Sequence, residues 1–364
     1  MSNDDLNAIR RRIDSIDWEI MQLLNQRIEI SVRARKLKKQ IFDPAREQQI
    51  FENVRKYSGK LMRPQLSEDV YKSILAESKY AQEKDFVLIG FQGEHGAYSE
   101  AASLYYEPSM IPLPCEEFYQ VFREVENGQL DFGIVPIENS LEGPITQVND
   151  LLIERNLKIV GEIKMPIHHC LLALPGTEYR NLKIVYSHPQ ALAQCREFIS
   201  RHKLEPRPYY DTAGAARMIS NEKPDASGVL ANKLCAELYH LEIIHENVED
   251  HESNSTRFVI LSKHESDKPG NKCTITFSLK DKAGALFSVL KVFSDRLLNL
   301  TRIESRPLRN SPGDYVFFID FEGSDKDENV IAALKEVHDA VRNLKFHGCY
   351  CSDSVSPQKT IDSV

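Results

Sequence analysis

The first forty residues carry apolar side chains at intervals of three and four residues. These positions are Leu6, Ile9, Ile13, Ile16, Ile20, Leu23, Ile30, Ala34 and Leu37. The spacing predicts one helix over about residues 5–40, with a length of roughly 50 Å. A helix this long cannot bury its apolar side against its own short segment, so we expect it to dimerise or to form an intertwined bundle.

Arg27 occupies a position of this pattern that should be apolar. A buried guanidinium is costly unless a carboxylate or an anionic ligand pairs with it. Taken alone, Arg27 is more typical of a structural ion pair. Lys38 follows about three helical turns later, so it should return to nearly the same side of the helix.

Two further helices are predicted before residue 85. Asp43 and Pro44 form a strong helix start, with Asp43 as the N-cap. A third helix is expected over about residues 67–82. The polar residues that these two helices offer to a site are Arg46, Glu47, Ser78 and Gln82. Each of them alone would more often be a solvated surface residue.

The central part of the chain contains an apolar strand that runs directly into polar residues. The strand is predicted over Phe132–Ile137 and is followed by Glu138, Asn139 and Ser140, then by a Gly143-Pro144 turn. Open α/β sheets bind ligands at the carboxyl ends of their strands, so this cluster indicates a polar site. The alternative is that these residues cap the following helix.

Strands and helices alternate on both sides of this segment. A glycine-rich turn at residues 93–99 follows a strand at residues 86–91, and backbone N–H groups there could bind an anion. A second strand-to-helix junction lies at residues 184–194, and residues 254–258 precede a strand at 259–261. The alternation predicts two α/β lobes with a cleft between them.

A polar linker at residues 263–271 leads into a third region. The elements expected there are a strand (273–279), a helix (285–297), two strands (around 303–305 and 315–321), a helix (329–344) and a last strand. This order is ferredoxin-like. Gly284 opens the first helix, which suits an amino-acid carboxylate, although simple turn chemistry is the commoner explanation. The tail, Ser352–Val364, is expected to be disordered.

Length and charge narrow the class of protein. A chain of 364 residues should hold two or three domains, since single cores rarely exceed ~250 residues. The net charge of −8 argues against nucleic acid as the main partner. The first 85 residues hold 17 Lys+Arg against 14 Asp+Glu, which suits a small anionic ligand. The apolar runs are far shorter than the ~20 residues of a membrane span, and the polar start is not a secretory signal.

Cysteine and histidine usage excludes two other classes of site. Seven cysteines without a CxxC pair indicate reduced thiols in the cytoplasm rather than a disulfide framework. The triplet His168-His169-Cys170 lacks metal-ligand spacing and should open a strand. In the cluster of His347, Cys349 and Cys351, alternation would place both thiols on one face of a terminal strand. We therefore expect no metal and no cofactor.

The helical segment resembles the chorismate mutase family, whose small domains form intertwined dimers. The resemblance implies the site residues Arg27, Lys38, Asp43, Arg46, Glu47, Ser78 and Gln82, with Arg10 donated by the partner subunit. The implied reaction, chorismate to prephenate, is a pericyclic rearrangement that needs no nucleophile. Arginines would hold the two substrate carboxylates, Lys38 and Gln82 would donate to the ether oxygen, and acidic side chains suit the substrate hydroxyl.

The segments GEHGAYS, FGIVPIENS, SHPQALAQC and NSTRF resemble the prephenate dehydratase family. The resemblance implies the catalytic residues Glu138, Asn139, Ser140, Ser187, Gln194, Thr256 and Arg257, and Ser99 at the substrate. Where the family often has a serine, position 97 is alanine. Thr256 is expected to donate to the departing hydroxyl group, with Glu138 as a proton reservoir if it is buried. Arg257 is expected to hold a substrate carboxylate or to form a structural salt bridge.

Two motifs of the last region resemble the ACT domain that is fused to phenylalanine-sensing dehydratases. The residues that the resemblance assigns to L-phenylalanine binding are Gly284, Ala285, Leu286, Glu304, Ser305, Arg306 and Pro307. The family's GALV reads GALF in this chain, and the ring of Phe287 could alter the pocket.

Together the resemblances imply the bifunctional chorismate mutase/prephenate dehydratase family with a C-terminal phenylalanine-binding ACT domain. The implied fold is multidomain: an all-helical mutase domain (1–85), a two-lobed α/β dehydratase domain like periplasmic binding proteins (86–265), a ferredoxin-like ACT domain (272–350) and a tail (351–364). The implied protein is a cytoplasmic homodimer or higher oligomer acting on chorismate and prephenate and inhibited by L-phenylalanine. It would need neither nucleic acid nor a membrane. The alternatives are a non-catalytic two-lobed binding protein and a dehydratase whose helical head serves only for dimerisation.

Overall fold

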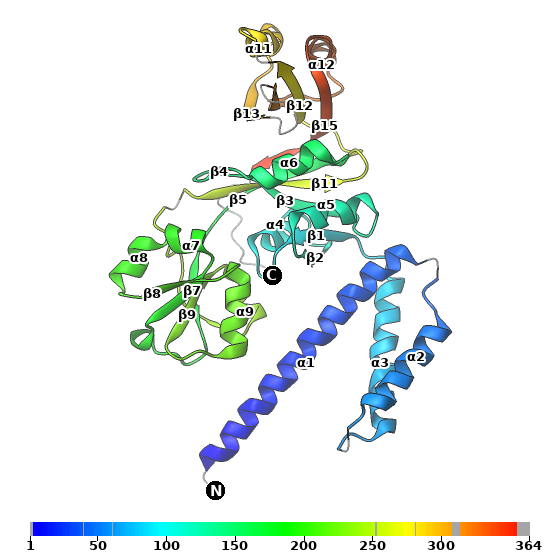
Figure 1. The fold of residues 1–364 in the computed structure, drawn as a ribbon, viewed down its shortest axis with the longest axis vertical. Coiled ribbons are helices and arrows are strands. Elements are labelled where there is room, and N and C mark those ends of the chain that lie inside the picture. Colours follow the sequence, from blue (N-terminus) through cyan, green and yellow to red (C-terminus); the bar gives the residue numbers. More distant parts are fainter. Residues whose placement is uncertain are drawn as a thin grey trace. The chain divides into compact units, whose positions relative to one another are not determined.

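The computed structural model describes residues 3–38, 40–59, 61–251, 253–280, 282–307 and 314–354. The chain divides into two compact units, which are described separately. One is a helical unit that ends at Leu88, and the other holds nearly all the rest of the chain. Figure 1 shows the ribbon of both units, with colours that follow the sequence.

The helical unit consists of the three helices that the sequence predicts. They are α1 (Asn3–Leu37), α2 (Pro44–Tyr57) and α3 (Pro64–Glu83). The Asp43 side chain caps α2 by accepting a hydrogen bond of 3.0 Å from the Arg46 backbone N–H, as predicted. The predicted helix end near residue 40 was wrong, because α1 ends at Leu37, and the assignment of Lys38 to the site stays a prediction. Lys38 is exposed beyond the helix, so the helical-face argument does not apply to it.

The apolar side of α1 is open to solvent in the single chain. The N-terminal half of the helix diverges from α2 and α3 (Figure 1). Ile13 is 52 % exposed and Ile30 is 61 % exposed, and most of the other apolar positions of the pattern are comparably exposed. The helical unit alone therefore leaves an apolar stripe without cover.

The second unit begins with a seven-stranded mixed sheet, whose strands lie in the order β16-β5-β11-β3-β1-β2, with β4 beside β3. Its elements are β1 (Leu88–Gln92), α4 (Tyr98–Tyr106), β2 (Ile111–Cys115), α5 (Phe118–Glu126), β3 (Phe132–Asn139), β4 (Gly143–Pro144), α6 (Thr146–Glu154), β5 (Lys158–Pro166), β11 (Ser255–Ser262) and β16 (Ser352–Ser354). Strand β11 runs antiparallel to both β3 and β5. These elements form the first lobe.

The chain forms a second lobe between β5 and β11. Its five-stranded sheet has the order β10-β6-β9-β7-β8. Its elements are β6 (Cys170–Ala173), a 3-10 turn (Tyr179–Asn181), β7 (Ile184–Ser187), α7 (Pro189–Gln194), α8 (Arg196–Arg201), β8 (Glu205–Pro208), α9 (Thr212–Glu222), β9 (Ser227–Ala231), α10 (Leu234–Leu238) and β10 (Glu242–His245). The two-lobed α/β prediction is therefore confirmed.

The last region has the predicted βαββαβ order. Its elements are β12 (Lys272–Lys280), α11 (Ala285–Asp295), β13 (Leu300–Pro307), β14 (Asp314–Glu322), α12 (Glu328–Ala340) and β15 (Arg342–Tyr350). They form an antiparallel sheet of order β13-β14-β12-β15. One face packs on the two helices around Phe277, Phe293 and Phe321. The helix expected to reach residue 344 ends at Ala340, because the backbone is already extended at Val341 and the chain continues as β15 from Arg342.

Three other sequence predictions need correction. Glu138 and Asn139 belong to β3 and do not follow it, and Thr256 and Arg257 lie inside β11. Cys349 is buried whereas Cys351 is exposed beyond the end of β15, so the two thiols do not share a strand face. Residues 352–354 form β16 beside β5, and residues 355–364 lie outside the described part of the chain.

The ferredoxin-like region packs closely against the first lobe. Gly348 of β15 approaches the backbone of β5 so closely that a Cβ at this position would overlap the carbonyl oxygen of Ile159. Its φ of 142° also lies in the region that favours glycine. The two backbones can therefore meet only because residue 348 has no side chain.

Candidate functional site

The helical unit brings three of its predicted site residues together. The Arg27 side chain donates to the Ser78 hydroxyl group at 2.5 Å, and Gln82 one turn further along α3 donates to the Ser31 hydroxyl group. Ser78 and Gln82 are buried. The buried Ser78 hydroxyl group at Arg27 and the buried Gln82 amide one turn away provide the polar surroundings that a small anion needs. Within the described part of the chain, Arg27 thus contacts a hydroxyl group and not a carboxylate, which supports a ligand site over a structural ion pair.

Two residues of this cluster were not predicted. Ser31 and Arg35 lie four and eight residues after Arg27, which places all three on one side of α1. Among the described atoms, the buried Arg35 Nε and Gln82 Oε1 have no hydrogen-bond partner. The helical spacing from Arg27 would have identified both residues.

The other predicted mutase residues lie apart from this cluster in the single chain. Glu47 forms an ion pair of 2.5 Å with Lys79, and Arg46 donates to Gln49 at 2.6 Å. Asp43 is used as the helix cap. Arg10 and Lys38 are exposed.

In the first lobe, Asn139 is the centre of a buried polar cluster. Its amide nitrogen lies 2.8 Å from Asn254 Oδ1 and 3.0 Å from the Thr256 hydroxyl oxygen. Its amide oxygen accepts hydrogen bonds from the backbone N–H groups of Leu141 and Glu142. These contacts fix the amide orientation, so the amide nitrogen must donate to Thr256.

The second lobe contributes Gln194 to the same cluster. Gln194 Oε1 accepts from Asn254 Nδ2 at 3.2 Å and lies 2.9 Å from His169 Nε2. Gln194 also donates to Glu142 at 3.2 Å. Burial lowers the pKa of His169, so the imidazole is neutral near pH 7. Asn254 and His169 were not predicted, although Asn254 belongs to the NSTRF motif.

The predicted serines have structural contacts. Ser187 is fully buried and donates to the Leu230 carbonyl oxygen at 2.6 Å. Ser140 accepts from the Ser255 N–H at 2.9 Å, which ties the end of β3 to β11. Ser99 is buried in the first turn of α4.

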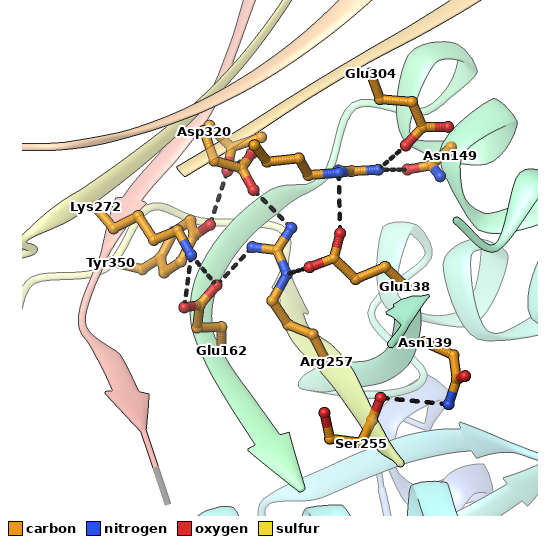
Figure 2. A network of polar contacts seen from close by, with 12 residues as sticks. Glu138, Asn139, Asn149, Glu162, Ser255, Arg257, Lys272, Glu304, Asp320 and Tyr350 are labelled. Atoms are coloured by element: carbon orange, nitrogen blue, oxygen red, sulfur yellow. Dashed lines mark hydrogen bonds and ion pairs between the residues drawn. The ribbon is translucent and has the colours of Figure 1, made fainter. Parts of the chain in front are cut away.

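Glu138 and Arg257 lie on the opposite face of the sheet from Asn139 and Thr256. The register pairs Asn139 with Thr256 and Glu138 with Arg257, and successive strand residues point to opposite faces. Figure 2 shows Arg257 surrounded by three carboxylates. They belong to Asp320 at 2.6 Å, Glu162 at 2.8 Å and Glu138 at 2.9 Å.

Arg257 was expected either to hold a substrate carboxylate or to form a structural salt bridge. These contacts favour the structural salt bridge. Burial alone would lower its pKa, but Asp320, Glu162 and Glu138 raise the pKa above its usual value. Glu138 also faces Arg302 at 3.5 Å. Both side chains are thus committed to ion pairs on the face away from Thr256.

A pocket of about 300 Å³ lies at the carboxyl end of β3, between the first lobe and β13. It is lined by Glu138, Asn139, Ser140, Gly143, Pro144, Lys164, Ser255, Arg257, Arg302, Ile303 and Glu304. Glu138 and Arg257, which were assigned to the dehydratase site, therefore line the same pocket as Glu304, which was assigned to phenylalanine binding.

The predicted phenylalanine-binding residues fall into two groups. Gly284 has a φ of 82° and opens α11 ahead of Ala285 and Leu286, and the neighbouring Phe287 is 68 % exposed. On β13, Glu304 pairs with Arg302, and Arg306 donates to Thr146 and Asp150 of α6 at 3.2 Å each. Ser305 and Pro307 are exposed.

Within the described ranges, no group of three His, Cys, Asp or Glu side chains is arranged to hold a metal ion. None of the described helices is both long and apolar enough to cross a membrane.

The fold and its polar clusters define a class of protein: a helical unit with a half-buried arginine beside buried polar groups, joined to a two-lobed α/β fold and a ferredoxin-like fold. Family models match all three parts in order. Residues 9–83 match chorismate mutase type II, residues 89–266 match prephenate dehydratase and residues 274–339 match the ACT domain.

Individual relatives agree with this class. The bifunctional chorismate mutase/prephenate dehydratase of Aquifex aeolicus is 34 % identical over 360 residues, which covers 95 % of this chain and 98 % of the relative. The structure of prephenate dehydratase in complex with L-Phe from Arthrobacter aurescens is 32 % identical with a TM-score of 0.67, covering 73 % of this chain and 90 % of that one. The structure of GqqA, described as a novel type of quorum quenching acylase, is 35 % identical with a TM-score of 0.69, covering 73 % and 98 %.

The chain belongs to the bifunctional chorismate mutase/prephenate dehydratase family. It is an enzyme that joins a chorismate mutase domain and a prephenate dehydratase domain to a C-terminal ACT domain.

Proposed function

We propose that the helical unit converts chorismate to prephenate and that the two-lobed unit converts prephenate to phenylpyruvate. The observation that carries the second step is the buried cluster of Asn139, Thr256 and Gln194, which joins both lobes at the ends of β3 and α7. The family assignment supports both steps.

In the mutase step, Arg27 binds a substrate carboxylate, while Ser78 and Gln82 line the site. Arg10 lies 17 residues before Arg27 on the same helix, a distance of about 25 Å at the rise of an α-helix. Arg10 therefore cannot reach the Arg27 site of its own chain. It completes the site of a second copy.

We propose a homodimer for the same reason. The uncovered apolar stripe of α1 fits a second copy of the helix, and pairing of the two stripes would bring each Arg10 toward the partner site. Analytical ultracentrifugation of the full chain should give a dimer or a multiple of it. A monomer that turns over chorismate would contradict this arrangement.

In the dehydratase step, prephenate loses its ring carboxylate as CO2 and its ring hydroxyl as water, with one proton supplied to the departing oxygen. Thr256 donates a hydrogen bond from its O–H to that oxygen and keeps its own proton, the proton that completes the water molecule comes from solvent, and the Asn139 amide holds the threonine in place. Glu138 lies on the other face of the sheet, so it is not the immediate proton source.

L-Phenylalanine inhibits the dehydratase through the ACT domain in this proposal. The positive φ of Gly284 exposes the start of α11, whose backbone N–H groups suit a carboxylate. Gly284→Ala adds a Cβ into open space, and Gly128→Ala, also at a positive φ in open space, is its matched control. We expect only the first variant to need at least ~10-fold more L-phenylalanine for inhibition, which corresponds to about 1.4 kcal/mol of lost coupling.

The test of the whole proposal supplies chorismate and follows prephenate and phenylpyruvate, with and without L-phenylalanine. Sequential formation of both products, with only the second step inhibited, is the expected result. Prephenate turnover without chorismate turnover would make the helical unit a dimerisation element. Absence of both activities would leave a binding protein.

We place the enzyme in the cytoplasm because its seven cysteines are free thiols. Cell fractionation checks this placement.

A further inference from the structure

The strands that hold the dehydratase cluster also hold a buried ion network on their other face. Thr256 and Arg257 are consecutive residues of β11, so their side chains point to opposite faces. Asn139 and Glu138 are arranged in the same way on β3. Any displacement of Arg257 therefore moves the backbone that carries Thr256.

The main partner of Arg257 belongs to the ACT domain. Asp320 of β14 is 0 % exposed, Arg257 is 6 % exposed, and Arg257 Nη2 donates to Asp320 Oδ2 at 2.6 Å. The other Asp320 oxygen accepts from the Thr274 hydroxyl group at 2.9 Å, and Tyr350 contacts that hydroxyl at 2.8 Å. Figure 2 shows Asp320 and Arg257 pointing toward one another from the two domains.

A second contact joins the same two domains. Helix α6 follows β3 after the short strand β4, and basic ACT residues hold it at several points. Arg302 and Arg306 of β13 donate to Asn149 at 3.0 Å and to Asp150 at 3.2 Å. Lys345 of β15 donates to the Leu152 carbonyl oxygen at 2.7 Å, near the end of the helix. Strand β13 carries the residues expected to bind L-phenylalanine. It is therefore one of the two ACT strands, with β15, that hold α6.

We propose that Asp320 is a positioning residue for the dehydratase: through Arg257 it sets the placement of Thr256 and transmits the state of the ACT domain to the catalytic cluster. Glu162 and Glu138 of the first lobe also hold Arg257, but Asp320 is the one of the three carboxylates with no solvent exposure, so a movement of the ACT domain that displaces Asp320 shifts the position that Arg257 prefers. L-Phenylalanine changes the position of Arg257 only to the extent that it binds one placement of the ACT domain more tightly than another. The inference rests on the proposed dehydratase activity.

The test compares Asp320→Asn and Asp314→Asn in the full chain. Asp320→Asn keeps the size of the side chain and an acceptor for Thr274 but removes the charge. Asp314 lies on the same strand, away from Arg257, and serves as the matched control. With added prephenate we expect Asp320→Asn to lower kcat by ~10-fold or more with less than ~3-fold change in KM, because the donor is displaced while the binding groups remain. Its response to L-phenylalanine should weaken by a similar factor.

Thermal unfolding of the full chain reports whether the unit that carries Asp320 is folded, and chorismate turnover in the same samples reports on the helical unit. Thr274→Val is a milder second variant that removes the hydroxyl group between Asp320 and Tyr350 but keeps the Asp320 charge, and it should change kcat and inhibition in the same direction. Amide exchange at residues 255–262 should respond to L-phenylalanine in the wild type and not in Asp320→Asn.

Three results are distinguishable. A folded Asp320→Asn variant with wild-type kcat and normal inhibition overturns the proposal. A rise confined to KM would assign Arg257 to the substrate carboxylate and also overturns it. If the wild type itself does not convert prephenate, the dehydratase assignment fails before the positioning role is reached.

Discussion

Asn139 and Thr256 face each other across two antiparallel strands, with the Asn139 amide nitrogen 3.0 Å from the Thr256 hydroxyl oxygen. An amide nitrogen can only donate, so the hydroxyl accepts this bond and keeps its own proton for another acceptor. Gln194 and Asn254 hold the pair from the side of the second lobe. The arrangement presents an oriented O–H donor, which is what a departing hydroxyl group requires.

Thr256→Val should abolish most of the dehydratase activity without changing the mutase. Valine keeps the shape and removes the donor, and the loss of one preorganised donor lowers kcat by ~10²–10³-fold. Prephenate should accumulate from chorismate, as measured by its acid-catalysed conversion after quenching. Thr301→Val, at an exposed strand position, is the control. Normal phenylpyruvate formation by Thr256→Val would place the donor elsewhere, with Gln194 as the next candidate.

Arg27→Ala should have the opposite selectivity. Arg27 donates to Ser78 within the buried part of the helical unit, and its loss removes the fixed positive charge for a substrate carboxylate. We expect chorismate turnover to fall by ~10²-fold or more, while added prephenate is still dehydrated. Ser78→Ala should show a smaller loss, and the exposed Arg63→Ala should show none. Wild-type chorismate turnover in Arg27→Ala would remove the mutase site from this helix.

The helices and the order of the strands could be predicted because they depend on local signals. The three-and-four spacing gives α1, and the pair Asp43-Pro44 marks the start of α2. Lys38 shows the limit of such signals. The apolar pattern extended the helix beyond Leu37, whereas Lys38 lies outside the helix. Where a helix ends depends on the turn that follows, which periodicity does not report.

The faces of the catalytic strands could not be predicted. Glu138, Asn139, Thr256 and Arg257 were all assigned to one site, yet the register sends two of them to each side of the sheet. Asn139 and Thr256 are 117 residues apart, so their pairing is a tertiary event that no local pattern contains. Asp320 was missed for the same reason: its role depends on a contact between domains.

Gly348→Ala should weaken the packing of the ACT domain on the first lobe. The new Cβ would overlap the Ile159 carbonyl oxygen, and its φ of 142° is strained for any residue with a side chain. We expect a loss of about 1–3 kcal/mol in the free energy of unfolding, the usual cost of overpacking, together with weaker inhibition by L-phenylalanine. Gly59→Ala, which meets nothing within 4 Å, is the control for thermal unfolding. Equal melting temperatures for the two variants would contradict the close approach.

His347 should make the ACT domain sensitive to acid. The ring is fully buried on β15, its Nε2 lies 2.9 Å from the Thr276 hydroxyl oxygen, and it stacks on Phe318. Burial, reinforced by repulsion from Lys345, lowers the pKa of His347 to about 3. The unfolded chain takes up this proton near pH 6.5 and the folded chain does not, so stability is retained above pH 6.5 and lost as the pH falls toward 3.

The slope of this loss can be measured by calorimetry between pH 7.5 and pH 4. The His347 contribution approaches about 1.4 kcal/mol per pH unit below pH 6.5. His347→Gln keeps a polar group near Thr276 but cannot be protonated, so its stability should decrease less steeply over the same range. His338→Gln changes a ring that is 72 % exposed and should retain the wild-type slope. If His347→Gln and the wild type lose stability in parallel below pH 6.5, the acid sensitivity arises from the carboxylates of the Arg257 network, and His347 is protonated in the folded protein without cost.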